Sequence, residues 1–157
     1  ALLACLFVFL TNKMQTNDTI SLLKVCDAGT KMAVSSIDEI LDQVQNQKFK
    51  EMLVEFKYKH TYIGNEIHNL LTQQDEEDKE PTPIAKGMSW IKTNMKMMMD
   101  GSDKTVADLI TDGCNMGVKS LSRYLNQYTA ADEKSKNICN ELISIEENFA
   151  VSIRCFL

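Results

Sequence analysis

Residues 102–128 carry the clearest structural pattern in this sequence. Their apolar side chains recur at steps of three and four residues, which is the period of an α-helix with one buried face. Two glycines, Gly113 and Gly117, lie on that face, although a glycine inside a helix costs about 1 kcal/mol relative to alanine. We therefore expect a neighbouring helix to approach closely at these two positions.

A similar spacing occurs earlier in the chain. The segments 26–31 (CDAGTK) and 114–119 (CNMGVK) place a cysteine, a glycine and a lysine at the same intervals. We interpret this as an internal repeat of two related helical halves. The interpretation predicts that Gly29 and Gly117 occupy equivalent positions and both permit close helix packing.

The same helical period extends over most of the chain. It predicts helices at 18–44, 48–74, 83–99, 103–129 and 132–156, and no segment alternates with the two-residue period of a strand. The break at 45–47 is short, whereas the charged run 75–80 followed by Pro-Thr-Pro forms a longer polar crossover. We predict an all-α fold, a ferritin-like four-helix bundle of two antiparallel helix hairpins with the short helix 83–99 in the crossover.

Composition limits the classes of partner. The net charge is −5 and no basic run occurs, which argues against nucleic acid and anionic membranes as partners. The five cysteines form no CxxC pair, a pattern typical of reduced thiols in the cytoplasm. Cys26 and Cys114 are candidates for a thiol pair across the bundle, and two separate buried thiols are the alternative.

The N-terminal residues differ from the rest of the chain. Residues 1–10, ALLACLFVFL, are apolar, but they are too few to span a bilayer and no basic segment precedes them. Met14 begins a polar lead-in to the first predicted helix. We therefore predict a single domain at 14–157, with 1–13 as an apolar extension that is not native to it, and no membrane association unless residues 1–10 are a targeting segment.

Several short motifs resemble those of a known family. They are GMSWIK at 87–92, Asp-Gly-Cys at 112–114 with Gly117 after it, Tyr-Leu at 124–125 and LLKVCDAG at 22–29. In these motifs the chain resembles the small bacterial proteins of the ferritin-like superfamily that are classed as domain of unknown function 2383. The resemblance covers nearly everything after Met14 and implies a ferritin-like fold without an established activity. The acidic pair usual in that family is replaced here by Cys114-Asn115, which argues against a carboxylate role at that point.

Four side chains are candidate metal ligands: His60, Glu146, Asp27 and Glu66. His60 and Glu146 lie on the predicted buried stripes of two helices, and Glu66 follows His60 on the same helix. Asp27 lies near Gly29, as Asp112 does near Gly113. A ferritin-like di-iron centre needs two Glu-x-x-His pairs, and the sequence contains none. The four side chains could therefore hold at most one divalent ion, either iron or another metal. The alternative, which the missing pairs favour, is a hydrogen-bonded core histidine with solvated acids.

A methionine-rich segment at 95–99, MKMMM, offers thioether ligands for Cu(I), although methionines more commonly fill gaps in a core or contact a partner.

Two interpretations of function remain. The chain is either a non-catalytic interaction or structural module, without a cofactor and acting as a homo-oligomer or with a protein partner, or a metal-binding, iron-type ferritin-like oxidoreductase with an incomplete or unconventional site.

Overall fold

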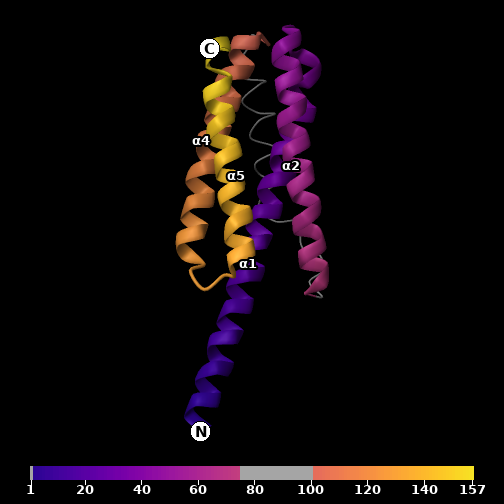
Figure 1. The fold of residues 1–157 in the computed structure, drawn as a ribbon. Coiled ribbons are helices and arrows are strands. Elements are labelled where there is room, and N and C mark those ends of the chain that lie inside the picture. Colours follow the sequence, from indigo (N-terminus) through magenta and orange to yellow (C-terminus); the bar gives the residue numbers. More distant parts are fainter. Residues whose placement is uncertain (1, 75–100) are drawn as a thin grey trace.

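The computed structural model describes residues 2–74 and 101–157, which form helices and short connections (Figure 1). The helices are α1 (Leu2–Ile40), α2 (Gln47–Gln73), α4 (Asp103–Gln127) and α5 (Glu133–Ser152), with 3₁₀ turns η1 (Leu41–Gln43) and η2 (Arg154–Phe156). No strand occurs in these two ranges, so the predicted all-α class is confirmed. The first helix begins at Leu2 rather than near residue 18, and the predicted helix 83–99 lies outside the described residues.

Polar side chains fix the starts of three helices. The side chains of Asn46, Ser102 and Asp132 each accept a hydrogen bond from the backbone N–H three residues ahead. Each bond satisfies one of the amide groups that a helix leaves without a partner in its first turn. These caps explain why α2, α4 and α5 begin where they do.

Hydrogen bonds between helix ends establish the directions of the helices. Both carboxylate oxygens of Asp103, at the start of α4, accept bonds of 2.7 Å from the backbone N–H groups of Gln45 and Asn46, just before α2. The starts of α2 and α4 are therefore adjacent, and the two helices run in the same direction (Figure 1). Consequently, the end of α2 and the start of α4 lie at opposite ends of the bundle.

The opposite end of the bundle is held in a similar way. Asp18 accepts a hydrogen bond of 2.9 Å from the N–H of Ala130, and Thr19 accepts one of 2.8 Å from the N–H of Asp132. These bonds connect the turn between α4 and α5 to α1. The two hairpins, α1 with α2 and α4 with α5, are thus joined at both ends.

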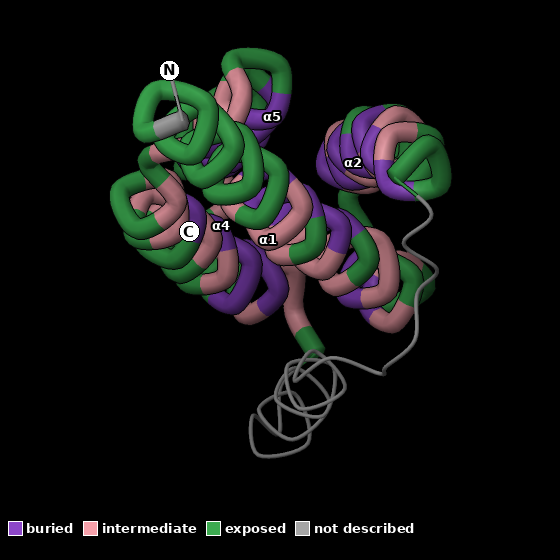
Figure 2. The backbone as a smooth tube through the Cα atoms, turned by 90° about the horizontal axis from the view of Figure 1, so that it is seen from below, coloured by how far each residue is buried: buried purple, intermediate pink, exposed green. Residues whose placement is uncertain are grey.

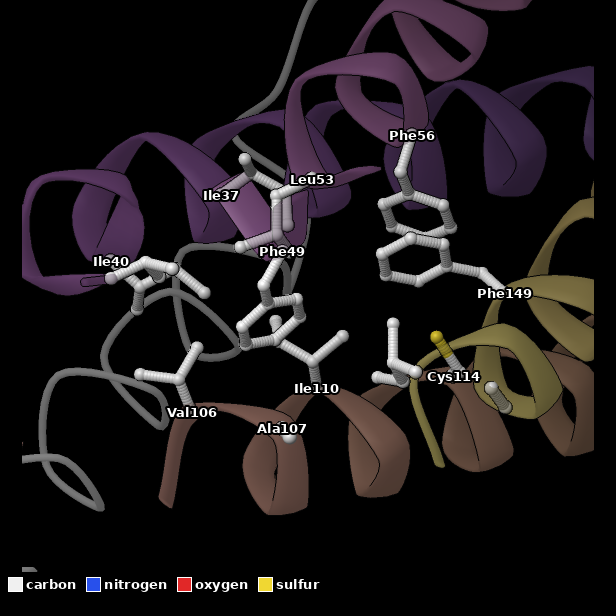
Figure 3. Close-up of a cluster of buried hydrophobic side chains, with 13 residues drawn as sticks. Ile37, Ile40, Phe49, Leu53, Phe56, Val106, Ala107, Ile110, Cys114 and Phe149 are labelled. Carbon is white, nitrogen blue, oxygen red and sulfur yellow. The ribbon is translucent and has the colours of Figure 1, made fainter. Parts of the chain in front are cut away.

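The core formed by the described residues contains two hydrophobic clusters. The first lies toward the starts of α2 and α4 and includes two stacked aromatic pairs, Phe49 with Phe156 and Phe56 with Phe149, with ring centroids 4.5 and 4.0 Å apart. Figure 3 shows this cluster with Phe56 and Phe149 face to face. The second cluster is nearer the other end of the bundle; its fully buried members include Leu22, Cys26, Ile63, Ile67, Cys139 and Leu142. Figure 2 shows that buried residues follow the inward faces of the helices.

The beginning of α1 projects beyond the bundle (Figures 1 and 2). Residues 3–17 are exposed, and they include large apolar side chains such as Leu3, Phe7 and Phe9. Helix α1 continues through this segment without a break. Within the described parts of the chain, no helix combines the length and the apolar character needed to cross a membrane.

Candidate functional site: a buried histidine–glutamate pair beside an apolar cavity

A histidine and a glutamate meet between the two hydrophobic clusters. His60 on α2 is 1% exposed and Glu146 on α5 is 8% exposed. The Nε2 atom of His60 lies 2.8 Å from Oε1 of Glu146, and Nδ1 lies 2.9 Å from the backbone oxygen of Phe56. We refer to His60 and Glu146 as the buried pair; it connects one hairpin to the other.

The acceptor at Nδ1 determines how many protons the pair holds. A carbonyl oxygen only accepts hydrogen bonds, so Nδ1 of His60 carries a proton that it donates to Phe56. The bond between Nε2 and Glu146 then contains one further proton, which resides either on the imidazole or on the carboxyl group. In both arrangements the net charge of the pair is zero, and both ring nitrogens are occupied.

The glycine at position 117 makes room for this glutamate. A Cβ atom at Gly117 would lie 3.3 Å from Cδ of Glu146, closer than an ordinary van der Waals contact. The close neighbour of Gly117 is the carboxyl group of Glu146 rather than the backbone of a facing helix. A residue with a side chain at 117 would require the carboxyl group of Glu146 to shift by a few tenths of an ångström.

The other two glycines do not pack against a neighbouring helix. A Cβ atom at Gly29 or Gly113 would meet no heavy atom within 4 Å. The prediction of close helix packing at these positions is wrong. Spacing along one helix does not determine how far away the facing helix lies.

Open space beside these glycines forms a cavity of about 380 Å³ between α1 and α4. All four helices contribute to its walls, and the three glycines and both members of the buried pair line it. Most of the remaining lining is apolar and includes Val25, Ala28, Met32, Leu109, Met116 and Leu142. A second groove, of about 450 Å³, lies on the other side of the bundle between α2 and α5 and does not include the buried pair.

The remaining candidate ligands lie apart from the buried pair. Asp27 forms an ion pair with Lys31, one turn along the same helix, at 2.7 Å. Glu66 faces Lys134 at 3.5 Å near the surface, and Asp112 is exposed. Across residues 2–74 and 101–157, no three side chains of histidine, cysteine, aspartate or glutamate are grouped so as to hold a metal ion. The structure thus brings together two of the four candidate ligands and separates Asp27 and Glu66 from them. The methionine-rich segment 95–99 lies outside the described residues.

Two buried thiol environments accompany the site. Burial and the neighbouring carboxyl group of Glu146 raise the pKa of Cys114 well above its ordinary value. A hydrogen bond to Cys139, together with burial, raises the pKa of Cys26, and the same bond lowers that of Cys139. The neighbour of Cys26 across the bundle is therefore Cys139, and all five cysteines are free thiols.

The sequence pattern indicated His60 and Glu146, but it did not indicate the cavity or the contact between Cys26 and Cys139. The glycines inside the predicted helices were the sequence signal for the cavity.

A scan against protein-family models and searches of curated proteins and of solved structures found no match to this chain.

Proposed function

We propose that this chain is a ferritin-like helical-bundle protein that acts as a non-catalytic interaction or structural module. The observation that carries this proposal is the hydrogen bonding of His60. Its two ring nitrogens bind the oxygen of Phe56 and the carboxyl group of Glu146, so neither is available to a metal or a substrate without breaking a buried bond. The buried pair is best explained as a connection between hairpins.

The directions of the helices support the ferritin-like part of the proposal. Two antiparallel hairpins whose connection joins opposite ends of the bundle are the arrangement of ferritin-like folds. The hydrogen bonds of Asp103 place the starts of α2 and α4 side by side, as that arrangement requires.

The competing function is metal-dependent oxidation at the buried pair. It is favoured by one observation: the pair lines a cavity, through which an ion could reach Glu146. His60 and Glu146 supply two ligands, whereas a di-iron centre gathers about six protein ligands around two ions.

Iron oxidation distinguishes the two functions. The purified, untagged protein is analysed for metals, loaded anaerobically with ferrous iron and exposed to oxygen while ferric product is followed by absorbance. We expect the same slow oxidation in the wild type, in His60→Ala and in Glu146→Gln, which keeps the shape of the side chain. Rapid oxidation of about two irons per chain in the wild type, lost in both variants, would establish the oxidoreductase instead.

We further propose that the module acts in the cytoplasm, as a homo-oligomer or with a protein partner, and without a cofactor or nucleic acid. The free thiols support a reducing compartment, and the large apolar side chains exposed on α1 support contacts with another chain. Light scattering coupled to size-exclusion chromatography would measure the oligomeric state.

A further inference from the structure

We propose that the cavity between α1 and α4 binds one small, uncharged and mainly apolar molecule that carries a hydrogen-bonding group. This inference goes beyond the proposed function, because it assigns the module a ligand of defined chemistry. It depends on the glycines, the buried pair and the shape of the cavity.

Two glycines that line the cavity have no packing role. Gly29 and Gly113 lie inside helices, where glycine is unfavourable relative to alanine. Neither position is crowded, since a Cβ atom at either would meet nothing within 4 Å. Helix packing therefore does not explain these residues, whereas preserving the volume of the cavity does.

The cavity wall also contains buried polar groups. Sites for small molecules are mostly apolar and contain a few polar groups that orient the ligand. Here the apolar wall contains the buried pair. Glu146 is 8% exposed, and it lines this cavity but not the groove between α2 and α5. A hydroxyl, amine or amide of a ligand can donate to that carboxyl group.

The charge of the pair then limits the charge of the ligand. One proton bridges His60 and Glu146, so the pair has no net charge with which to balance an ion. Beside the pair, a charged ligand would lose its hydration without a compensating charge, because Lys24, the other charged side chain of the lining, is exposed to solvent and has an interaction of its own. An uncharged ligand avoids this loss, while its apolar body gains the contacts that an unfilled void lacks.

The depth and the volume of the cavity suit a small molecule. The space opens to solvent beside exposed residues such as Met116, and its floor reaches the buried pair inside the bundle. Its volume of about 380 Å³ is within the range of about 300–1,000 Å³ that is usual for small-molecule sites.

The test uses 1-aminoanthracene, a fluorescent aromatic amine that is uncharged at neutral pH, titrated into the full-length protein. We expect saturable binding at one site per chain. Gly113→Leu and Gly29→Leu, which place a side chain into the cavity, should each weaken binding by about tenfold or more. The anionic analogue anthracene-1-carboxylate should bind about tenfold more weakly to the wild type.

The matched control is Asn148→Leu, which adds the same side chain in the groove between α2 and α5 and should leave binding unchanged. Thermal unfolding of each variant shows whether it is folded, and the two glycine variants provide independent tests. Absence of saturable binding would overturn the proposal. The same result is expected if residues 75–100 or a second copy of the chain, rather than a small molecule, occupies the cavity. Equal weakening by Asn148→Leu, or none by either folded glycine variant, would overturn it as well.

Discussion

Gly113 and Gly117 lie about one turn apart on α4 but have different surroundings. Gly113 borders open space, whereas the carboxyl group of Glu146 lies directly against Gly117. Both glycines have the same intrinsic cost in a helix. The effect of replacing each one therefore depends on its neighbour rather than on helix propensity.

Leucine substitutions at the two positions should have different effects on stability. Gly117→Leu should lower the free energy of unfolding by about 1–3 kcal/mol, because the new side chain displaces Glu146 from a packed interior. Gly113→Leu, the matched control, should leave it unchanged or raise it by up to about 1 kcal/mol, because the side chain enters open space and helix propensity improves. Urea denaturation measures both values, and a Gly117→Leu variant as stable as Gly113→Leu would contradict this assignment.

At the scale of helices, Asp103 connects the starts of α2 and α4. Its carboxylate accepts two backbone hydrogen bonds from residues 45 and 46 while it also occupies the first turn of α4, where a negative charge is favourable. The same side chain therefore supports the turn before one helix and the start of another.

Replacing Asp103 should destabilise the bundle by about 1–2 kcal/mol. Asp103→Ala removes both hydrogen bonds, and the loss is moderated because water can reach residues 45 and 46. Asp108→Ala removes the same charge from an exposed position on the same helix and should change the stability by less than about 0.5 kcal/mol. Equal effects of the two substitutions in urea denaturation would show that charge, rather than the two bonds, is responsible.

Helix positions were largely predictable from the sequence because caps and periodicity are local. The predicted ranges of α2, α4 and α5 agree with the structure to within a few residues at their ends, and the range predicted from residue 132 begins at the residue that caps α5, Asp132. The start of the first helix was predicted incorrectly. Helix α1 continues through Asn17 and Asp18, and Asp18 accepts a bond from the turn before α5, which sequence periodicity does not indicate.

The predicted metal ligands illustrate which site features the sequence can indicate. His60 and Glu146 were expected to face each other because each lies in phase with the apolar stripe of its helix, and they meet in the structure. Asp27 has Lys31 four residues later, a spacing that itself indicates an ion pair within one helix. Glu66 pairs with Lys134 of another helix, which depends on packing that the sequence alone does not determine.

At the scale of the whole molecule, the buried pair joins two hairpins that are each held together by their own contacts. His60 belongs to the first hairpin and Glu146 to the second, and the two hydrophobic clusters lie on either side of the pair. The pair is therefore placed where relative movement of the hairpins would break it. This mechanical connection is the central element of the proposed non-catalytic function.

A double-mutant cycle tests that connection most directly. Urea denaturation at neutral pH measures the free energies of unfolding of four proteins: the wild type, His60→Leu, Glu146→Leu and the double variant. Each single substitution leaves one buried polar group without its partner and should cost about 3–5 kcal/mol. The double substitution should cost less than the sum of the two by about 1–3 kcal/mol, because it removes both groups together. Costs that add to within about 0.5 kcal/mol would show that His60 and Glu146 are not coupled and would contradict their role in joining the hairpins.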